Sequence, residues 1–176
     1  MNNKRLLFEY LVFELDKYCF ELNLDTRTVM TKLRLQKLLF FISTLFATKE
    51  DHVLLDVFDH FYALPYGPVE IDIYEMMASN RFEHISFDEN VCVITNRNAT
   101  SFANLPCKQI NAINSALNYL KGGRGRLYLE CPVFELVNLS HRWSVWRIAM
   151  EYAHSVGHNK ERIFTDEILD STKFFW

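Results

Sequence analysis

The stretch that most constrains the fold lies at residues 31–46 and reads TKLRLQKLLFFISTLF. Apolar side chains recur along it at helical spacing, and the adjacent Phe40 and Phe41 extend the apolar surface beyond one stripe. A helix that is apolar around most of its circumference is normally buried by neighbours on several sides. Thr31 is a good N-cap, because its hydroxyl can accept a hydrogen bond from an unpaired amide of the first turn. We therefore expect a central buried helix here and call it the hub helix.

The first turns of the hub helix carry basic and polar side chains, among them Arg34, Gln36 and Lys37. Side chains of these types are mostly exposed in folded proteins, so we expect this end of the helix to reach solvent. Arg34 and Lys37 could then form, together with Arg142 and Arg147, a basic face for an acidic partner. A solvated face without a partner is the alternative interpretation.

The rest of the chain predicts further helices and one small β-hairpin. Residues 3–22 repeat apolar side chains at helical spacing, and residues 106–121 do so between a proline and a glycine pair. Residues 81–95 switch to an alternating pattern around a polar turn at 88–90, which indicates a hairpin. The predicted fold class is α+β and predominantly α-helical, with a single compact helical domain over residues 1–176 around the central buried helix. Other helices are expected at residues 68–79 and 133–139, after Ser140 or Ser144, and after a cap at Thr165, with a short extended piece at residues 127–129.

Residues 64–69, LPYGPV, contain two prolines and a glycine. Proline lacks an amide hydrogen and has a fixed φ, so this composition excludes a regular helix or a central strand. Pro68 can stand at the first position of the helix that follows, because the amides of a first turn have no helical partner. Gly67 can adopt a backbone conformation that other residues avoid.

Overall composition excludes several classes of protein. The 176 residues suit one domain, and the formal net charge of -3 argues against a general nucleic-acid binder, which would carry a basic excess. The four cysteines are far apart and form no CxxC pair, so we expect reduced buried thiols and a cytoplasmic protein. We see no secretory signal and no uncharged apolar run of about 18 residues, so we expect no membrane span.

No sequence pattern of a common enzyme class is present, and the weaker candidates have simpler interpretations. The segment at residues 122–125, GGRG, could bind phosphate, but it follows a helix instead of opening one, which favours a solvated loop. His154 and His158 have metal-ligand spacing, yet Gly157 between them favours a surface turn. His141 could act on a nucleophile, but a hydrogen-bonding role between two helices fits better. We therefore predict no catalytic, cofactor or metal site.

Three segments together resemble a known family. LRLQKLLFF at residues 33–41, ALPYGPVEIDIY at 63–74 and ELVNLSHRWSVWRIA at 135–149 are similar, in order and separation, to the elements of the Panacea family of antitoxin domains, which includes SocA-like and phage-associated proteins. The resemblance spans roughly residues 5–175. The chain departs from the family pattern at residues 64–65, where the family often has Trp, and at 144–145, where it often has a small residue or Pro.

This resemblance implies an antitoxin that binds and neutralises a protein toxin encoded by a neighbouring gene, without catalysis of its own. A proteolytic adaptor, which would deliver the toxin to a protease, is the first alternative. An uncharacterised enzyme and a DNA-binding regulator are weaker ones, and the charge of the chain disfavours nucleic acid as a partner. The oligomeric state, the identity of the toxin and its target stay open.

The resemblance also selects candidate site residues, which either define the fold or contact the partner. The aromatic residues Phe174, Phe175 and Trp176 raise the same question, because they could pack on the core or form part of an interface. The seven candidates are Gln36, Lys37, Tyr66, Gly67, Pro68, His141 and Trp146.

Overall fold

The computed structural model describes residues 2–172, apart from the side chains of Asn2 and Ala99, so the question raised about residues 174–176 lies outside the described residues. Helices make up most of the structure, and the strands are few and antiparallel, which confirms the predicted fold class. No described helix has the length and apolar character needed to cross a membrane. The elements are α1 (Asn2–Glu21), α2 (Thr26–Val29), α3 (Lys32–Thr44), β1 (Phe61–Leu64), β2 (Gly67–Glu70), α4 (Ile71–Ser79), β3 (Ile85–Asp88), β4 (Val91–Ile94), a 3₁₀ segment (Ala99–Asn104), α5 (Cys107–Lys121), a 3₁₀ segment (Gly123–Arg126), α6 (Leu127–Glu130), α7 (Val133–His141), α8 (Ser144–Ser155), β5 (Glu161–Ile163) and α9 (Thr165–Asp170).

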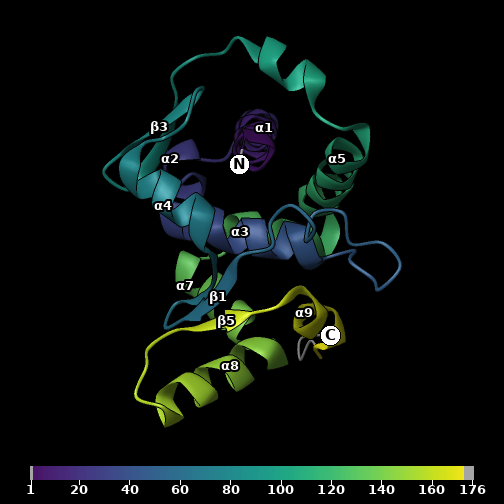
Figure 1. The fold of residues 1–176 in the computed structure, drawn as a ribbon. Coiled ribbons are helices and arrows are strands. Elements are labelled where there is room, and N and C mark those ends of the chain that lie inside the picture. The colour runs from purple at the N-terminus through teal and green to yellow at the C-terminus, as the bar shows by residue number, and fades with distance from the viewer. Residues whose placement is uncertain (1, 173–176) are drawn as a thin grey trace.

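The hub helix is α3, and it lies at the centre of the molecule between α1 on one side and the sheet of β1 and β5 on the other (Figure 1). Thr31 caps it as predicted, and the Thr31 hydroxyl accepts a hydrogen bond from the Arg34 amide at 3.4 Å. Every residue from 34 to 44 is buried. The prediction of a solvent-exposed first turn is therefore wrong for Arg34, Gln36 and Lys37, whose polar groups find backbone partners inside the protein.

The segment that contains LPYGPV forms a β-hairpin. β1 is the central strand of a three-stranded antiparallel sheet in the order β2–β1–β5, and Leu64 at its end pairs with Gly67. Pro68 lies in the edge strand β2, so the prediction of a helix start at Pro68 is wrong, whereas the exclusion of a helix and of a central strand holds for residues 65–69. An edge strand accepts proline because one of its sides needs no ladder amide. Glu70 caps α4 instead, because its carboxylate accepts the Ile73 amide at 2.8 Å.

The second hairpin, β3–β4, agrees with the prediction, and its turn falls at Glu89 and Asn90. Two backbone hydrogen bonds attach it to the start of the hub helix: the Lys32 amide donates to the Asn90 carbonyl, and the Cys92 amide donates to the Met30 carbonyl, both at 2.8 Å. The hairpin therefore holds the N-terminal end of α3 in place.

The C-terminal half follows the prediction with local differences. α5 and α7 begin after Pro106 and Pro132 as expected. Residues 127–129 belong to the helix α6 and not to an extended piece, because the carbonyls at its end are bound by the buried Arg34 side chain. The N-cap of α9 is Phe164, and Thr165 is its first helical residue. The Phe164 amide is satisfied by the Glu167 carboxylate at 2.8 Å.

Candidate functional site

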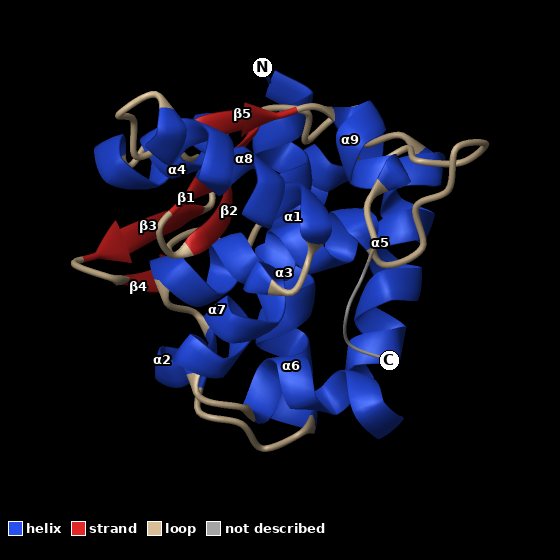
Figure 2. Ribbon diagram, turned by 90° about the horizontal axis from the view of Figure 1, so that it is seen from below, coloured by secondary structure: helices blue, strands red, loops and turns tan. Residues whose placement is uncertain are grey.

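All seven candidate residues meet where the β1–β2 hairpin lies against α3 and the α7–α8 corner, and we call this place the hairpin junction. The hairpin is beside α3 and α7 in two perpendicular views (Figure 1, Figure 2), and β2 contacts both helices. The three segments that resemble the Panacea family supply these three parts. The junction consists of Gln36, Lys37, Tyr66, Gly67, Pro68, His141 and Trp146.

Gln36 and Lys37 cover the outer edge of β2. The Gln36 side chain accepts a hydrogen bond from the Glu70 amide at 3.0 Å and donates one to the Glu70 carbonyl at 3.4 Å, as a neighbouring strand would. The Lys37 ammonium donates to the Pro68 carbonyl at 2.6 Å. Pro68 and Glu70 are two residues apart and turn the same backbone edge outward. The hub helix therefore pairs with an edge that would otherwise be open.

Lys37 is a fully buried amine, with 0% exposure. Among the described residues no carboxylate lies within ion-pair distance of it, and burial lowers its pKa to about 7. A cation without a counter-ion is costly to bury, and loss of the proton is the usual response. Lys37 therefore changes charge near neutral pH inside the junction.

Gly67 lets the hairpin approach both helices. Its φ is +93°, a conformation that side chains with a Cβ rarely adopt. A Cβ at this position would clash with the Ser140 hydroxyl oxygen and would lie 3.0 Å from the Lys37 nitrogen. Ser140 is itself fixed, since it is buried and its hydroxyl donates to the Val137 carbonyl at 2.7 Å. Only glycine fits this contact without a shift of α3 or α7.

His141 and Trp146 join α7 to α8 and to the hairpin. Their rings are stacked at a centroid distance of 3.6 Å with 7° between the planes. The Trp146 indole donates to the Leu64 carbonyl at 3.0 Å. Burial, reinforced by the nearby Lys37 charge, lowers the pKa of His141, and a hydrogen bond to the Pro65 backbone offsets only part of this effect. The stack therefore holds a largely neutral imidazole at neutral pH.

Tyr66 is the junction residue that faces outward. It is 61% exposed at the tip of the hairpin, and its ring meets the equally exposed ring of Phe134 on α7, with the centroids 6.4 Å apart. Sequence reasoning missed Phe134. The sequence did indicate that Phe134 is exposed. In the predicted helix at 133–139 this large apolar residue shares a face with Glu135 and Asn138, opposite the buried Leu136.

Arg34 was also missed as a structural residue. Its buried guanidinium donates to the carbonyls of Tyr128 at 3.2 Å, Leu129 at 3.0 Å and Cys131 at 2.6 Å, and burial lowers its pKa. Since Arg34 and Lys37 are both buried, they do not form a surface with the exposed Arg142 and Arg147. The predicted basic face is therefore wrong.

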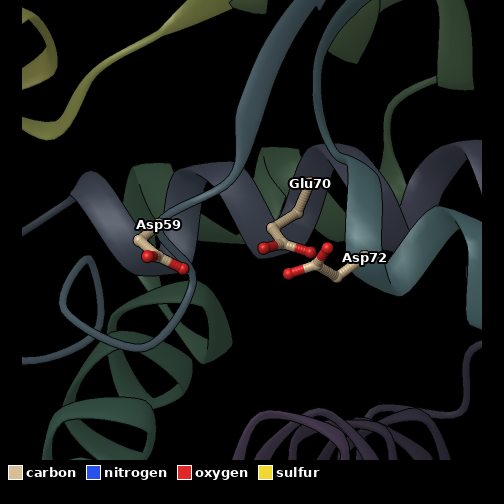
Figure 3. A group of neighbouring side chains, drawn as sticks. All are labelled: Asp59, Glu70 and Asp72. Atoms are coloured by element: carbon tan, nitrogen blue, oxygen red, sulfur yellow. The ribbon is translucent and has the colours of Figure 1, made fainter. Parts of the chain in front are cut away.

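One group of carboxylates has the arrangement of a metal site, and Figure 3 shows Asp59, Glu70 and Asp72 turned toward one another. The Lys4 ammonium already fills the place of a cation, at 2.9 Å from Asp59, 2.7 Å from Glu70 and 2.6 Å from Asp72. Burial alone would lower the pKa of Lys4, but its hydrogen bonds to the three carboxylates outweigh burial and raise it. The arrangement ties α1 to β2 and does not call for a metal.

The Ser140 hydroxyl and the GGRG segment take structural roles. The Ser140 hydroxyl is bound to the Val137 carbonyl and is not activated by His141. In the GGRG segment, Gly125 is buried against the Tyr119 carbonyl, and Arg126 pairs with Glu130 at 2.5 Å.

The family comparison agrees with this geometry. A family profile described as "Antitoxin SocA-like, Panacea domain" matches residues 35–147, well over half of the chain, and the matched range contains all seven junction residues. No similar curated protein and no similar solved structure is found. The resemblance noted in the sequence is confirmed.

Proposed function

Because the chain belongs to the family of SocA-like antitoxins with a Panacea domain, we propose that it binds a protein toxin encoded by a neighbouring gene and neutralises it by direct contact. The family assignment gives the chain an antitoxin-like role. The toxin contact is the further step, and it is an act of binding that needs no catalytic group.

The observation that carries this proposal is the exposed pair of Tyr66 and Phe134 on the rigid hairpin junction. Each side chain is 61% exposed, although both are large and aromatic. Aromatic residues at the centre of an interface contribute much of the binding energy in protein complexes. The backbone beneath Tyr66 is fixed by Gly67 and by the Lys37–Pro68 hydrogen bond, so little conformational entropy would be lost on binding.

This assignment divides the seven candidate residues into two groups. Six of them are turned inward and act by holding the hairpin against the helices. Tyr66 alone is presented to a partner, and Phe134 joins it from α7. We therefore propose a direct contact for Tyr66 and a positioning role for the other six residues.

The test is growth of cells that express the product of the adjacent reading frame, with and without this protein, followed by co-purification. We expect toxicity that is relieved by a stable complex. Tyr66→Ala and Phe134→Ala should each weaken the complex by about tenfold or more while the protein stays folded. Phe20→Ala is the matched control, because Phe20 is 88% exposed but lies on α1, away from the junction.

Three different outcomes would reject the proposal. If neither neighbouring product is toxic, the toxin contact is wrong. If relief needs a protease and the toxin disappears from cells, delivery to that protease replaces direct neutralisation. If Phe20→Ala weakens the complex as much as Tyr66→Ala does, the hairpin tip is not the contact.

A further inference from the structure

A groove lies at the other end of the hub helix, between the last turn of α3, the segment at residues 45–56 and the first half of α5. Its volume is about 800 Å³. Apolar side chains form part of its lining, including Ile42, Leu54 and Ala112, and Phe46 stands at its side with 56% of its surface exposed. The groove is distinct from the hairpin junction, and none of the seven junction residues lines it.

The wall made by the segment at residues 45–56 is well fixed. The Thr48 amide donates to the Asp51 carbonyl at 2.8 Å, and the Asp51 amide donates back to the Thr48 hydroxyl at 3.1 Å. Leu54 and Leu55 are buried and anchor the segment to the core. A groove with fixed walls binds a ligand at a low entropic cost.

The charges around the groove are mostly negative. Glu50, Asp51 and Asp56 line it from the loop, and Lys108 on α5 is the cation opposite them. His52 lies 3.4 Å from Asp56 and offsets that charge only when the imidazole is protonated. An apolar floor below an acidic rim complements a ligand that carries both apolar and basic groups.

A second observation points to a ligand in the groove. Ser43 is 3% exposed and lines the groove, and its hydroxyl oxygen has no hydrogen-bond partner among the described residues. Buried polar groups are nearly always satisfied, and an exception calls for an explanation. The oxygen is closed to solvent in this structure, so a donor from a bound segment reaches it when the Ser43 side chain rotates toward the groove.

We propose that this groove binds a basic segment of a partner protein through at least one aromatic or branched aliphatic side chain. The apolar side chain rests on Ile42, Phe46 and Ala112, and the flanking Lys or Arg side chains pair with Glu50 and Asp51. The proposal does not depend on the toxin contact at Tyr66, because the two surfaces share no residue.

The test measures binding of labelled peptides to the full chain by fluorescence anisotropy. The probe is Lys-Lys-Leu-Phe-Lys-Lys, with Glu-Glu-Leu-Phe-Glu-Glu and Lys-Lys-Gly-Gly-Lys-Lys as controls for charge and for the apolar anchor. We expect the first peptide to bind at least tenfold more tightly than either control. Its affinity should fall as salt is raised, because the rim charges are exposed.

Two variants locate the site. Ala112→Trp fills the floor of the groove and should weaken binding of the first peptide by tenfold or more. Asp51→Lys reverses a rim charge without a change in the core and should weaken it severalfold. Asp88→Lys is the matched control, because it makes the same charge change at an exposed aspartate on β3 and should leave binding unaltered.

Three results would overturn the proposal. The first is no binding of the first peptide, or equal binding of the control peptides. The second is the same loss for Asp88→Lys as for Asp51→Lys. The third is a gain in peptide affinity when the end of the chain is altered. Residues 173–176 lie outside the described residues and include one lysine and three aromatic residues. If Phe174→Ala/Phe175→Ala/Trp176→Ala raises peptide affinity tenfold, the occupant is the chain itself and not a partner.

Discussion

The Lys37 ammonium donates a hydrogen bond to the Pro68 carbonyl at 2.6 Å, and this contact joins the hub helix to a strand residue that has no amide hydrogen of its own. The amine is fully buried, and the described residues offer it no carboxylate. The hairpin junction therefore contains a group whose charge depends on pH in the neutral range.

Lys37 should make the protein more stable as pH rises from about 7 toward 10. Burial lowers the pKa of Lys37 in the folded protein to about 7, against an ordinary value of 10.5, so the unfolded chain binds more protons in this window. The unfolding free energy then rises with pH, by up to about 1.4 kcal/mol per unit. Urea unfolding of the wild type and of Lys37→Met at several pH values measures this effect.

The comparison with Lys37→Met isolates the lysine from groups that act in the opposite direction. Burial raises the pKa of Cys19 to about 11 and that of Tyr128 to about 12, so both groups reduce stability at high pH in the two proteins alike. The difference in unfolding free energy between wild type and variant should change with pH between 7 and 10. A difference that is constant over this range would show that Lys37 keeps its ordinary pKa.

Gly67→Ala should destabilise the protein by roughly 3–5 kcal/mol, because it adds backbone strain at φ +93° and a clash with Ser140. Gly157→Ala separates the two causes. Gly157 has φ +76°, but nothing lies within 4 Å of a Cβ placed there, so only the strain of about 1–2 kcal/mol remains. Thermal and urea unfolding measure both variants. An equal loss of unfolding free energy in Gly67→Ala and Gly157→Ala would mean that α7 moves away from the hairpin without cost.

The hub helix could be predicted from the sequence because its signals are local. Thr31 supplies the cap, and the apolar residues after it define a helix that must be buried. The burial of Arg34 and Lys37 could not be predicted in the same way, since residue type alone predicts exposure. Their partners are carbonyls of residues 128–131 and of Pro68, which only the folded chain brings near.

Pro68 shows a second limit of sequence reasoning. A residue without an amide hydrogen fits the first turn of a helix and the edge of a sheet equally well, and the choice depends on what pairs with the neighbouring strand. The candidate site, too, could be predicted only in part. Resemblance selected seven residues that the fold brings together, but it gave no sign of Lys4, whose partners Glu70 and Asp72 are more than sixty positions away.

Lys4→Met should destabilise the protein by roughly 3 kcal/mol at neutral pH, because Asp59, Glu70 and Asp72 would lose their shared cation. Burial alone would raise the pKa of Asp72, but its hydrogen bonds to Lys4 and His60 lower it overall. This stabilisation is present above the ordinary pKa of an aspartate and is lost as pH falls through the lowered value. The difference in unfolding free energy between wild type and Lys4→Met, measured by urea unfolding, should therefore become smaller at acidic pH.

The control for Lys4 is Lys17→Met, which removes an exposed ion pair with Glu14 and should change stability by less than about 1 kcal/mol.

Calcium offers a second check on the carboxylate group. Millimolar Ca²⁺ should leave the melting temperature of the wild type unchanged, because Lys4 holds the three carboxylates. A clear rise in melting temperature would show that the ion displaces the lysine.

Trp146→Ala should raise the pKa of His141 toward its ordinary value of 6.5. Burial is the main cause of the lowered value, and the stacked indole, with its centroid 3.6 Å away, is part of that burial. Its removal exposes the imidazole to water and favours the charged form. A pH titration of the His141 ring signals by NMR measures the shift. Tyr152→Ala is the control, because Tyr152 lies on α8 like Trp146 but at an exposed site. If the pKa of His141 stays low in Trp146→Ala, then Lys37, and not the stack, sets the charge of the imidazole, and the junction responds to pH through the lysine.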